Sequence, residues 1–397
     1  MSLDGLPKLS AVEELRIGSV DDPDFGFARP YGLDIDAEGQ IYVMEGSEPE
    51  IRVYSADGRR LVRRIGGRGG GPGEFMSAPS FGVVGDTIWA YEGGSSGRIT
   101  LFDREGTVLS TGQTRGLRIP LWSSYGYVRP RRMLPGGVFM GELSMIGSSR
   151  DDPELTTGPT DTIPVPRVLF DATGAVIDTV GWDPSPPPRM ARPPGTSSSR
   201  SEVVRTSTRG YFVTTAPTES DYWFPLPDGR IILDMATPSA PDAAVFTIVR
   251  LDLAGDTIYR RDLAYRPEPY TSDVLDSIAI RAARSGGGIV MQGEAGPDEA
   301  EAAAAARLIR DKLAYPALQQ PVRGYHVGQD EALWLMRRSE LGPTRWIVLD
   351  PQAVPRGELE LPAGTRPVWS LGNTFWAIQT DELDIPWLVR YRLAAGS

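Results

Sequence analysis

A four-residue polar turn that follows one or two apolar residues recurs along the chain. It reads Ser-Ala-Asp-Gly at residues 55–58, and four later segments follow the same plan, at 103–106, 171–174, 252–255 and 350–353. Each turn separates two segments of strand-forming residues, which is typical of a β-hairpin. Hairpins that recur at intervals of tens of residues predict an array of similar β units, each packed against the next.

Each hairpin follows another pair of predicted strands, so the repeating unit has four antiparallel strands. Residues 30–36 and 41–45, for example, flank Glu38-Gly39 ahead of the first turn. Six units can be placed in this way, but the last supplies only three strands, ending at 387–391. We expect residues 12–17 to supply its fourth strand, because that pairing removes the open sheet edges of a ring. The chain is therefore predicted to be all-β, a six-bladed β-propeller closed by an N-terminal strand, with residues 1–397 forming a single domain.

The composition narrows the classes of partner and chemistry. The chain has no cysteine, which removes disulfides, thiol nucleophiles and thiolate metal sites. Its net charge of −11 argues against nucleic acid as a partner. No segment reaches the run of about 18 apolar residues that a membrane span needs, so no integral membrane contact is expected. A protein or a small anionic ligand remains as the expected partner, and the oligomeric state stays open.

Two segments carry a resemblance to a known family. PYGLDIDAEGQIYVMEGSEPEIRVYSADGRRLVRRIGGRGGGPGEF, at 30–75, and RITLFDREGTVLS, at 98–110, resemble six-bladed β-propellers of the NHL-repeat type. The GGRGGGPGEF junction and the closing DELDIPWLVRYRL are similar to a group of bacterial envelope propellers. The first two units match well and the middle units match weakly. The resemblance implies the fold and a ligand- or protein-binding role, but no single reaction.

The resemblance also implies a periplasmic or extracellular location. Residues 1–10 lack the charged and apolar regions of a secretion signal. We therefore expect an exported protein whose signal peptide is absent from this chain, with a cytoplasmic protein as the alternative.

The glycine-rich segment GGRGGGPGEF allows two interpretations. A phosphate-binding loop needs Lys-Ser/Thr directly after its glycines and a helix whose N-terminal amides face the anion. Here the glycines stand between predicted strands and are followed by Pro72-Gly73-Glu74-Phe75. The segment is therefore predicted to connect the first two units.

Three insertions interrupt the repeating units, at residues 146–162, 183–219 and 265–320. Propeller geometry sends all three to one face, conventionally the top, where binding usually occurs on a rigid scaffold. The third insertion is predicted to be partly helical. One helix starts at Thr271-Ser272-Asp273 and a second, alanine-rich helix follows Gly296-Pro297-Asp298. The helices serve either as structural cover or as a lid over the central channel.

Two sets of charged residues repeat from unit to unit and are expected near the top of the channel. Four arginines precede the innermost strands: Arg29, Arg131, Arg323 and Arg366. Four carboxylates end the second strands: Glu45, Glu92, Glu142 and Asp234. The structural interpretation is that the two sets neutralise each other in pairs that brace neighbouring blades. The functional interpretation is that unpaired arginines bind a carboxylate, a phosphate or an acidic sugar.

Catalysis by the established propeller routes has little support in the sequence. His326 is the only histidine, so sites built from several histidines are excluded, and a lone histidine is more often structural. Lactonase propellers hold a divalent cation with Asp, Glu and Asn, but the single asparagine, Asn373, lies in a Gly-Asn turn that explains it. An all-carboxylate calcium site remains as an alternative.

We therefore predict a non-enzymatic propeller that binds a ligand or a protein through its insertion-capped top face and needs no cofactor. The arginines would clamp an anion, and Trp223 would form an apolar wall. The predicted ligand-binding residues are Arg29, Arg131, Arg323, Arg366, Trp223 and His326. One alternative is a lactonase-like, metal-dependent hydrolase or lyase that holds Ca²⁺ with Glu45, Glu92, Glu142 and Asp234. Another is a structural subunit of an extracellular assembly.

Overall fold

The computed structural model describes most of the chain. The described residues are 1–93, 96–118, 125–145, 165–183, 201–205, 210–214, 222–233, 238, 244–284, 298–313, 315–337 and 343–396. Among them, three antiparallel sheets have four strands each, in chain order. Their strands are β2 (Pro30–Ile35), β3 (Ile41–Glu45), β4 (Glu50–Tyr54) and β5 (Leu61–Gly66); β6 (Ser80–Val84), β7 (Thr87–Glu92), β8 (Arg98–Phe102) and β9 (Val108–Gln113); and β17 (Tyr222–Leu226), β18 (Gly229–Leu233), β19 (Ala244–Asp252) and β20 (Thr257–Tyr265).

A five-stranded sheet lies between the second and third of these sheets in the sequence. It extends the same plan by one strand, in the order β10-β11-β12-β13-β14. These are β10 (Arg115–Arg118), β11 (Tyr125–Met133), β12 (Phe139–Met145), β13 (Val165–Phe170) and β14 (Val176–Asp183). A separate hairpin pairs β15 (Ser201–Arg205) with β16 (Gly210–Thr214).

The remaining described strands form one eight-stranded sheet, in which β1 (Lys8–Ile17) joins two units of four strands. One unit is β21 (Gly324–Val327), β22 (Leu333–Arg337), β23 (Thr344–Leu349) and β24 (Pro355–Leu361), and the other is β25 (Thr365–Leu371), β26 (Thr374–Thr380), β27 (Pro386–Ala395) and β1. β1 runs antiparallel to β27 and also meets β24 in parallel at Lys8 and Leu9. The prediction that the N-terminal segment supplies the fourth strand of the last unit is confirmed, and the strand is longer than residues 12–17.

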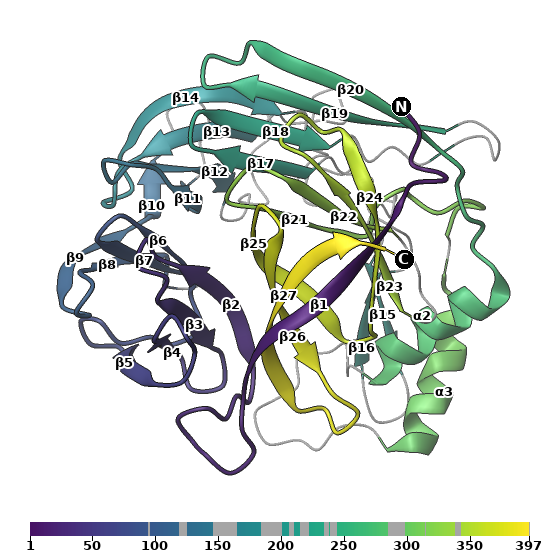
Figure 1. The fold of residues 1–397 in the computed structure, drawn as a ribbon, viewed down its shortest axis with the longest axis horizontal. Helices are drawn as coiled ribbons and strands as arrows, with labels where there is room; N and C mark the ends of the chain where they lie inside the picture. The colour runs from purple at the N-terminus through teal and green to yellow at the C-terminus, as the bar shows by residue number, and fades with distance from the viewer. Residues whose placement is uncertain are drawn as a thin grey trace.

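The N-terminal segment contacts a third unit as well. The amide of Leu3 donates to the carbonyl of Ala264 in β20 at 2.7 Å, and Leu3 is only 1% exposed. Figure 1 shows this segment passing from β20 across β24 to β27. Residues 1–17 therefore tie together the edges of units that are far apart in the sequence.

The recurring polar turns form hairpins, as predicted. The five turns connect β4 to β5, β8 to β9, β13 to β14, β19 to β20 and β23 to β24. In four of them a glycine with positive φ ends the turn, and in the fifth Ala353 takes that conformation, with φ 57°. Asp171 illustrates the local chemistry, because its carboxylate accepts the amides of Thr173 and Ala175.

The strands that open the four-strand units lie beside one another. We call them the first strands, and in the five-stranded sheet, where β10 is the additional strand, the first strand is β11. β2 lies beside β6 and β25, β11 lies beside β6 and β17, and β21 lies beside β25. Phe224 of β17 contacts Tyr325 of β21, with ring centroids 4.1 Å apart. The first strands gather near the middle of the molecule in Figure 1.

The apolar core lies between neighbouring sheets. Trp89 of β7 packs edge-on against Phe139 of β12, whose ring in turn stacks on Phe170 of β13. Trp334 and Phe375 make the corresponding contact between β22 and β26, with centroids 4.9 Å apart. These sheets thus bury aromatic side chains against one another, as packed sheets do.

The two predicted helices are present. α2 (Ser272–Arg284) and α3 (Glu299–Arg310) pack on each other through small side chains, among them Ala279, Ala283 and Ala305. Asp298 caps α3 by accepting the amide of Glu301 at 2.8 Å. The helices also contact β15 and β16, and in Figure 1 they lie at one side of the molecule. No helix in the described part of the chain is long and apolar enough to cross a membrane.

The other two insertions are described only in part. Residues 146–162 lie outside the described residues, and of 183–219 the described residues are Asp183, β15 and β16. The glycine-rich segment connects β5 to β6, as predicted, with Phe75 buried at its end. The carbonyls of Gly70, Gly71 and Glu74 all accept hydrogen bonds from Arg98.

Candidate functional site

Two adjoining cavities open between the first strands. The first, which we call the Arg366 cavity, has a volume of about 270 Å³, and the second, the Arg132 cavity, has a volume of about 300 Å³. Phe81, Tyr325 and His326 line both, so the cavities share a wall. They are small by the standard of ligand pockets, and they fit a compact ligand better than an extended one.

A cation without a carboxylate partner lines the Arg366 cavity. The guanidinium of Arg366 makes one long hydrogen bond, 3.4 Å, to the carbonyl of Tyr31, and it forms no ion pair with any described residue. Desolvation lowers the pKa of Arg366, although the group remains charged at neutral pH. Tyr31, Ser80 and Tyr325 also line this cavity. The cavity therefore combines a positive charge with hydroxyl groups and aromatic surface.

His326 stands where the two cavities meet. Its Nε2 lies 3.0 Å from the hydroxyl oxygen of Ser370. Desolvation, followed by the nearby charge of Arg366, lowers the pKa of His326 to about 4. The imidazole is therefore neutral at physiological pH, and it adds no positive charge of its own.

The Arg132 cavity holds a buried carboxylate that connects three units. Asp34 of β2 accepts the amide of Val83 in β6 at 2.8 Å, and it accepts the amide of Ile35 at 2.9 Å. The side-chain amide of Gln329, just after β21, donates to the same carboxylate at 3.3 Å. Desolvation raises the pKa of Asp34 to about 6, against the lowering effect of the hydrogen bonds from the Val83 and Ile35 amides.

Arg132 lines the same cavity without a direct partner. It is half-buried, and it forms no hydrogen bond or ion pair with any described residue. Desolvation lowers its pKa, while the charges of Asp34 and Glu331 act in the opposite direction. Arg132 is thus a second cation whose donors the described part of the protein leaves unsatisfied.

Strand register explains why these residues meet. Asp34, Arg132 and His326 each stand one residue before the last residue of β2, β11 and β21. Those last residues pair with the first residue of the next strand in all three sheets. Sequence reasoning missed Asp34 and Arg132, although a charged residue next to the apolar end of an inner strand was a usable signal.

The predicted arginine set divides in the structure. Arg131 lines the Arg132 cavity, but it forms an ion pair with Glu142 at 2.8 Å. Arg29 and Arg366 each directly precede a proline. Arg131 instead follows Pro130 and stands in the bulge there, and the arginine that precedes this proline is Arg129. The prediction of Arg131 as an equivalent of those two arginines is therefore corrected. Arg323 lines neither cavity, and its amide donates to the carbonyl of Met336.

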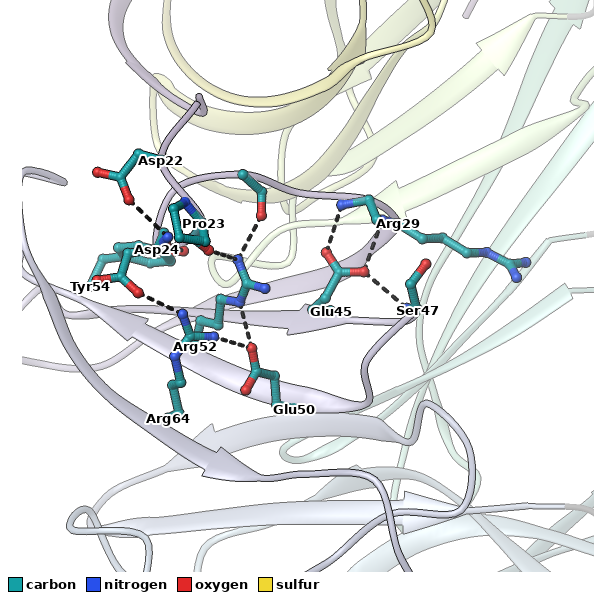
Figure 2. Close-up of polar contacts among 12 residues, drawn as sticks. Asp22, Pro23, Asp24, Arg29, Glu45, Ser47, Glu50, Arg52, Tyr54 and Arg64 are labelled. Carbon is teal, nitrogen blue, oxygen red and sulfur yellow. Dashed lines mark hydrogen bonds and ion pairs between the residues drawn. The ribbon is translucent and has the colours of Figure 1, made fainter. Parts of the chain in front are cut away.

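Trp223 and Arg29 lie outside both cavities. Trp223 is buried, its indole donates to Glu142 at 3.2 Å, and the guanidinium of Arg167 lies 4.4 Å from its ring centroid. Figure 2 shows the exposed side chain of Arg29 directed away from Glu45, which instead accepts the backbone amide of Arg29 at 2.8 Å. The guanidinium of Arg29 forms no ion pair with the described residues.

The predicted carboxylates hold backbone amides and arginines. Glu45 accepts the amides of Ala28, Arg29 and Ser47. Glu92 accepts the amide of Met76 at 2.7 Å and Nε of Arg98 at 2.8 Å. Glu142 pairs with Arg131 and with Arg167 of β13. Asp234 lies outside the described residues, within which no group of three or more potential metal ligands occurs.

Two arginines of the first sheet, Arg52 and Arg64, have carboxylate partners. Arg52 pairs with Glu50 at 2.7 Å and donates to the carbonyl of Gly26 at 2.7 Å (Figure 2). Arg64 reaches both Glu50 and Asp24. These contacts fasten the segment before β2 to the hairpin of β4 and β5, which is a structural role.

Comparison with known proteins yields low similarity. No protein-family model and no curated protein sequence matches the chain. Among solved structures, a Bacteroides fragilis protein described as exported is 14% identical, with a TM-score of 0.45 over 99% of this chain and 97% of its own. The calcium-binding protein regucalcin from Agrobacterium tumefaciens is 13% identical, with a TM-score of 0.35 over 97% and 96% of the two chains. A streptogramin B lyase is 13% identical, with a TM-score of 0.32 over 98% and 88%.

Proposed function

We propose that the chain is a six-bladed β-propeller that binds a small anionic ligand in the channel between its first strands and does not transform it. Arg366 carries this proposal. It is a cation in the wall of a cavity, and no described carboxylate neutralises it.

The order of the first strands supports the six-bladed arrangement. The contacts run from β21 to β25, β2, β6, β11 and β17, and the rings of Phe224 and Tyr325 join β17 back to β21. The pairing of β1 with β27 completes the last unit in the way that ring closure requires. A closed ring leaves a central channel, and the two cavities lie along its wall.

Arg366 gives its cavity a positive charge, which favours an anion. His326 is neutral at physiological pH because its pKa is lowered to about 4. A carboxylate or phosphate that enters the cavity can accept charge-assisted hydrogen bonds from the guanidinium, and further bonds from the hydroxyls of Tyr31 and Ser80. One such charge-assisted contact strengthens binding by about ten- to a hundredfold.

The three described carboxylates of the predicted metal site already have structural partners, so we do not build the function on them. Glu92 and Glu142 are held by arginines, and Glu45 by backbone amides. Each is used to join strands within or between sheets. The proposal needs no cofactor.

The location and the role of the insertions complete the proposal. We infer an exported bacterial protein, as the resemblance to envelope propellers implied. The described residues of the 265–320 insertion line neither cavity, so the proposed site does not include them. Fractionation of the native host followed by immunodetection tests the location, and recovery in the cytoplasm alone would contradict it.

Binding of small acids, followed by isothermal titration calorimetry, tests the proposed function. The probes are acetate, glycolate, butyrate and inorganic phosphate, with the corresponding neutral amides and alcohols as controls. We expect at least one anion to bind and its neutral counterpart not to bind, and Arg366→Gln to weaken binding about tenfold or more. Arg29→Gln is the matched control, because Arg29 also precedes a proline at the start of a first strand but lies outside the cavities. Equal affinity of the wild type and Arg366→Gln would refute the proposal.

A further inference from the structure

The two adjoining cavities each contain one arginine without a carboxylate partner. Arg366 comes from β25 and Arg132 from β11, on different units of the molecule. Between them stand the shared wall residues Phe81, Tyr325 and His326. A ligand that fills only one cavity leaves the other guanidinium without an anion.

We propose that the ligand carries two anionic groups, one held by Arg366 and the other by Arg132, joined by a short body that crosses His326. This inference rests on the proposed function and specifies the class of ligand. Dicarboxylates, sugar diacids and phosphorylated acids share this chemistry.

The environment of Arg132 supports a role in binding rather than in structure. Structural arginines of this chain, such as Arg98 and Arg167, contact carboxylates directly and lie mostly buried. Arg132 is half-buried, but none of its five donors is used by a described residue. An unsatisfied guanidinium in a cavity wall is favourable mainly when an anion completes it.

Asp34 does not take that place. Its carboxylate already accepts hydrogen bonds from the amides of Val83 and Ile35 and from the side chain of Gln329. The charge of Asp34 acts on the pKa of Arg132 from a distance, and the two side chains form no ion pair. Asp34 therefore fixes three first strands in position and leaves the donors of Arg132 available to a ligand.

The shared wall suits the middle of such a ligand. Phe81 and Tyr325 offer aromatic surface to a short carbon chain. His326 uses Nε2 in its contact with Ser370, which leaves Nδ1 for a neutral polar group such as a hydroxyl.

Calorimetric titration with matched acids tests the inference. The probes are linear dicarboxylates from malonate to adipate, each compared with the monocarboxylate of the same chain length. In the wild type we expect the best dicarboxylate to bind about tenfold or more tightly than its monocarboxylate. Equal affinities at every length would overturn the inference, whatever the variants do.

Two variants then separate the two proposals. Arg132→Gln is expected to lower dicarboxylate affinity to that of the monocarboxylate and to leave the monocarboxylate unaffected, whereas Arg366→Gln weakens both. Arg59→Gln, at an exposed arginine directly after the first hairpin turn, is the control. If Arg132→Gln leaves the dicarboxylate affinity unchanged while Arg366→Gln lowers it, the ligand has one anionic group and only the proposed function stands. If neither variant weakens binding, both proposals are wrong.

Discussion

The turn between β7 and β8 and the walls of the two cavities contain the same residue types, but only in the first are their hydrogen bonds completed by the protein. At the end of β7, Glu92 accepts two backbone amides and the guanidinium of Arg98, and Arg98 donates to three carbonyls of the glycine-rich connection. In the two cavities, Arg366 has one long hydrogen bond and Arg132 has none among the described residues. A network that the protein completes by itself holds strands together, and one that it leaves incomplete is available to a ligand.

A pair of arginines at matched positions makes the same point. Arg29 and Arg366 each precede a proline that is followed by a bulge at the start of a first strand. Their local sequences are alike, but only Arg366 lines a cavity. Tertiary neighbours, and not the local motif, therefore decide which arginine can bind a ligand.

The largest expected effect on the free energy of unfolding comes from removing the carboxylate that Arg98 contacts. Glu92→Ala removes a carboxylate whose side chain is 2% exposed and leaves Arg98, 12% exposed, without its counter-charge. Breaking a buried ion pair in this way costs about 3–5 kcal/mol in the free energy of unfolding. Urea unfolding followed by circular dichroism measures it, with Glu92→Gln as the control that keeps one acceptor. A loss below about 1 kcal/mol would show that the pair is not structural.

The next effect concerns pH, because His326 and Asp34, which line the cavities, act on stability in opposite directions. The folded-state pKa of His326 is lowered to about 4, so its contribution to stability is lost as pH falls from about 6.5 to 4. The folded-state pKa of Asp34 is raised to about 6, so its contribution is lost as pH rises from about 4 to 6. Each is worth about 3 kcal/mol at full effect, and together they largely cancel between pH 4 and 6.5.

Single variants expose this cancellation. Relative to the wild type, Asp34→Asn is expected to lose stability as pH falls from about 6.5 to 4, since only the His326 effect remains. His326→Gln is expected to lose stability as pH rises over the same window, since only the Asp34 effect remains. Unfolding free energies measured at several pH values check both slopes, and parallel curves for the three proteins would contradict the assignment.

The sequence allowed much of the fold to be predicted because its signals are local. The Asp-x-x-Gly turns specify hairpins through side-chain contacts within a few residues, and the alanine-rich segment specifies α3 in the same way. The cavity residues depend on distant partners. Asp34 gained its role from Val83 and Gln329 on other units, and the bulge at Arg131 changed the alignment of the arginines. The charged residue near the apolar end of each strand is visible in the sequence, but its partners on other units are not.

A smaller effect is expected from an exposed pair on the glycine-rich connection. Arg68 lies 3.5 Å from Glu48, and both side chains are more than half exposed. Solvent screening limits such a pair to about 1 kcal/mol or less. Arg68→Ala therefore serves as the exposed counterpart of Glu92→Ala in the same unfolding assay. A loss of unfolding free energy as large as that of Glu92→Ala would show that burial does not decide how much these ion pairs stabilise the protein.

The smallest expected change in stability belongs to the residue with the largest expected effect on binding. Arg366→Gln removes one long hydrogen bond and a charge that desolvation makes unfavourable, as the lowered pKa of Arg366 indicates. The free energy of unfolding without ligand should change by about 0.5 kcal/mol or less, or rise slightly. A loss above about 2 kcal/mol would place Arg366 with Arg98 among the structural arginines. It would also remove the physical reason for assigning its guanidinium to a ligand, because the protein itself would then be using that charge.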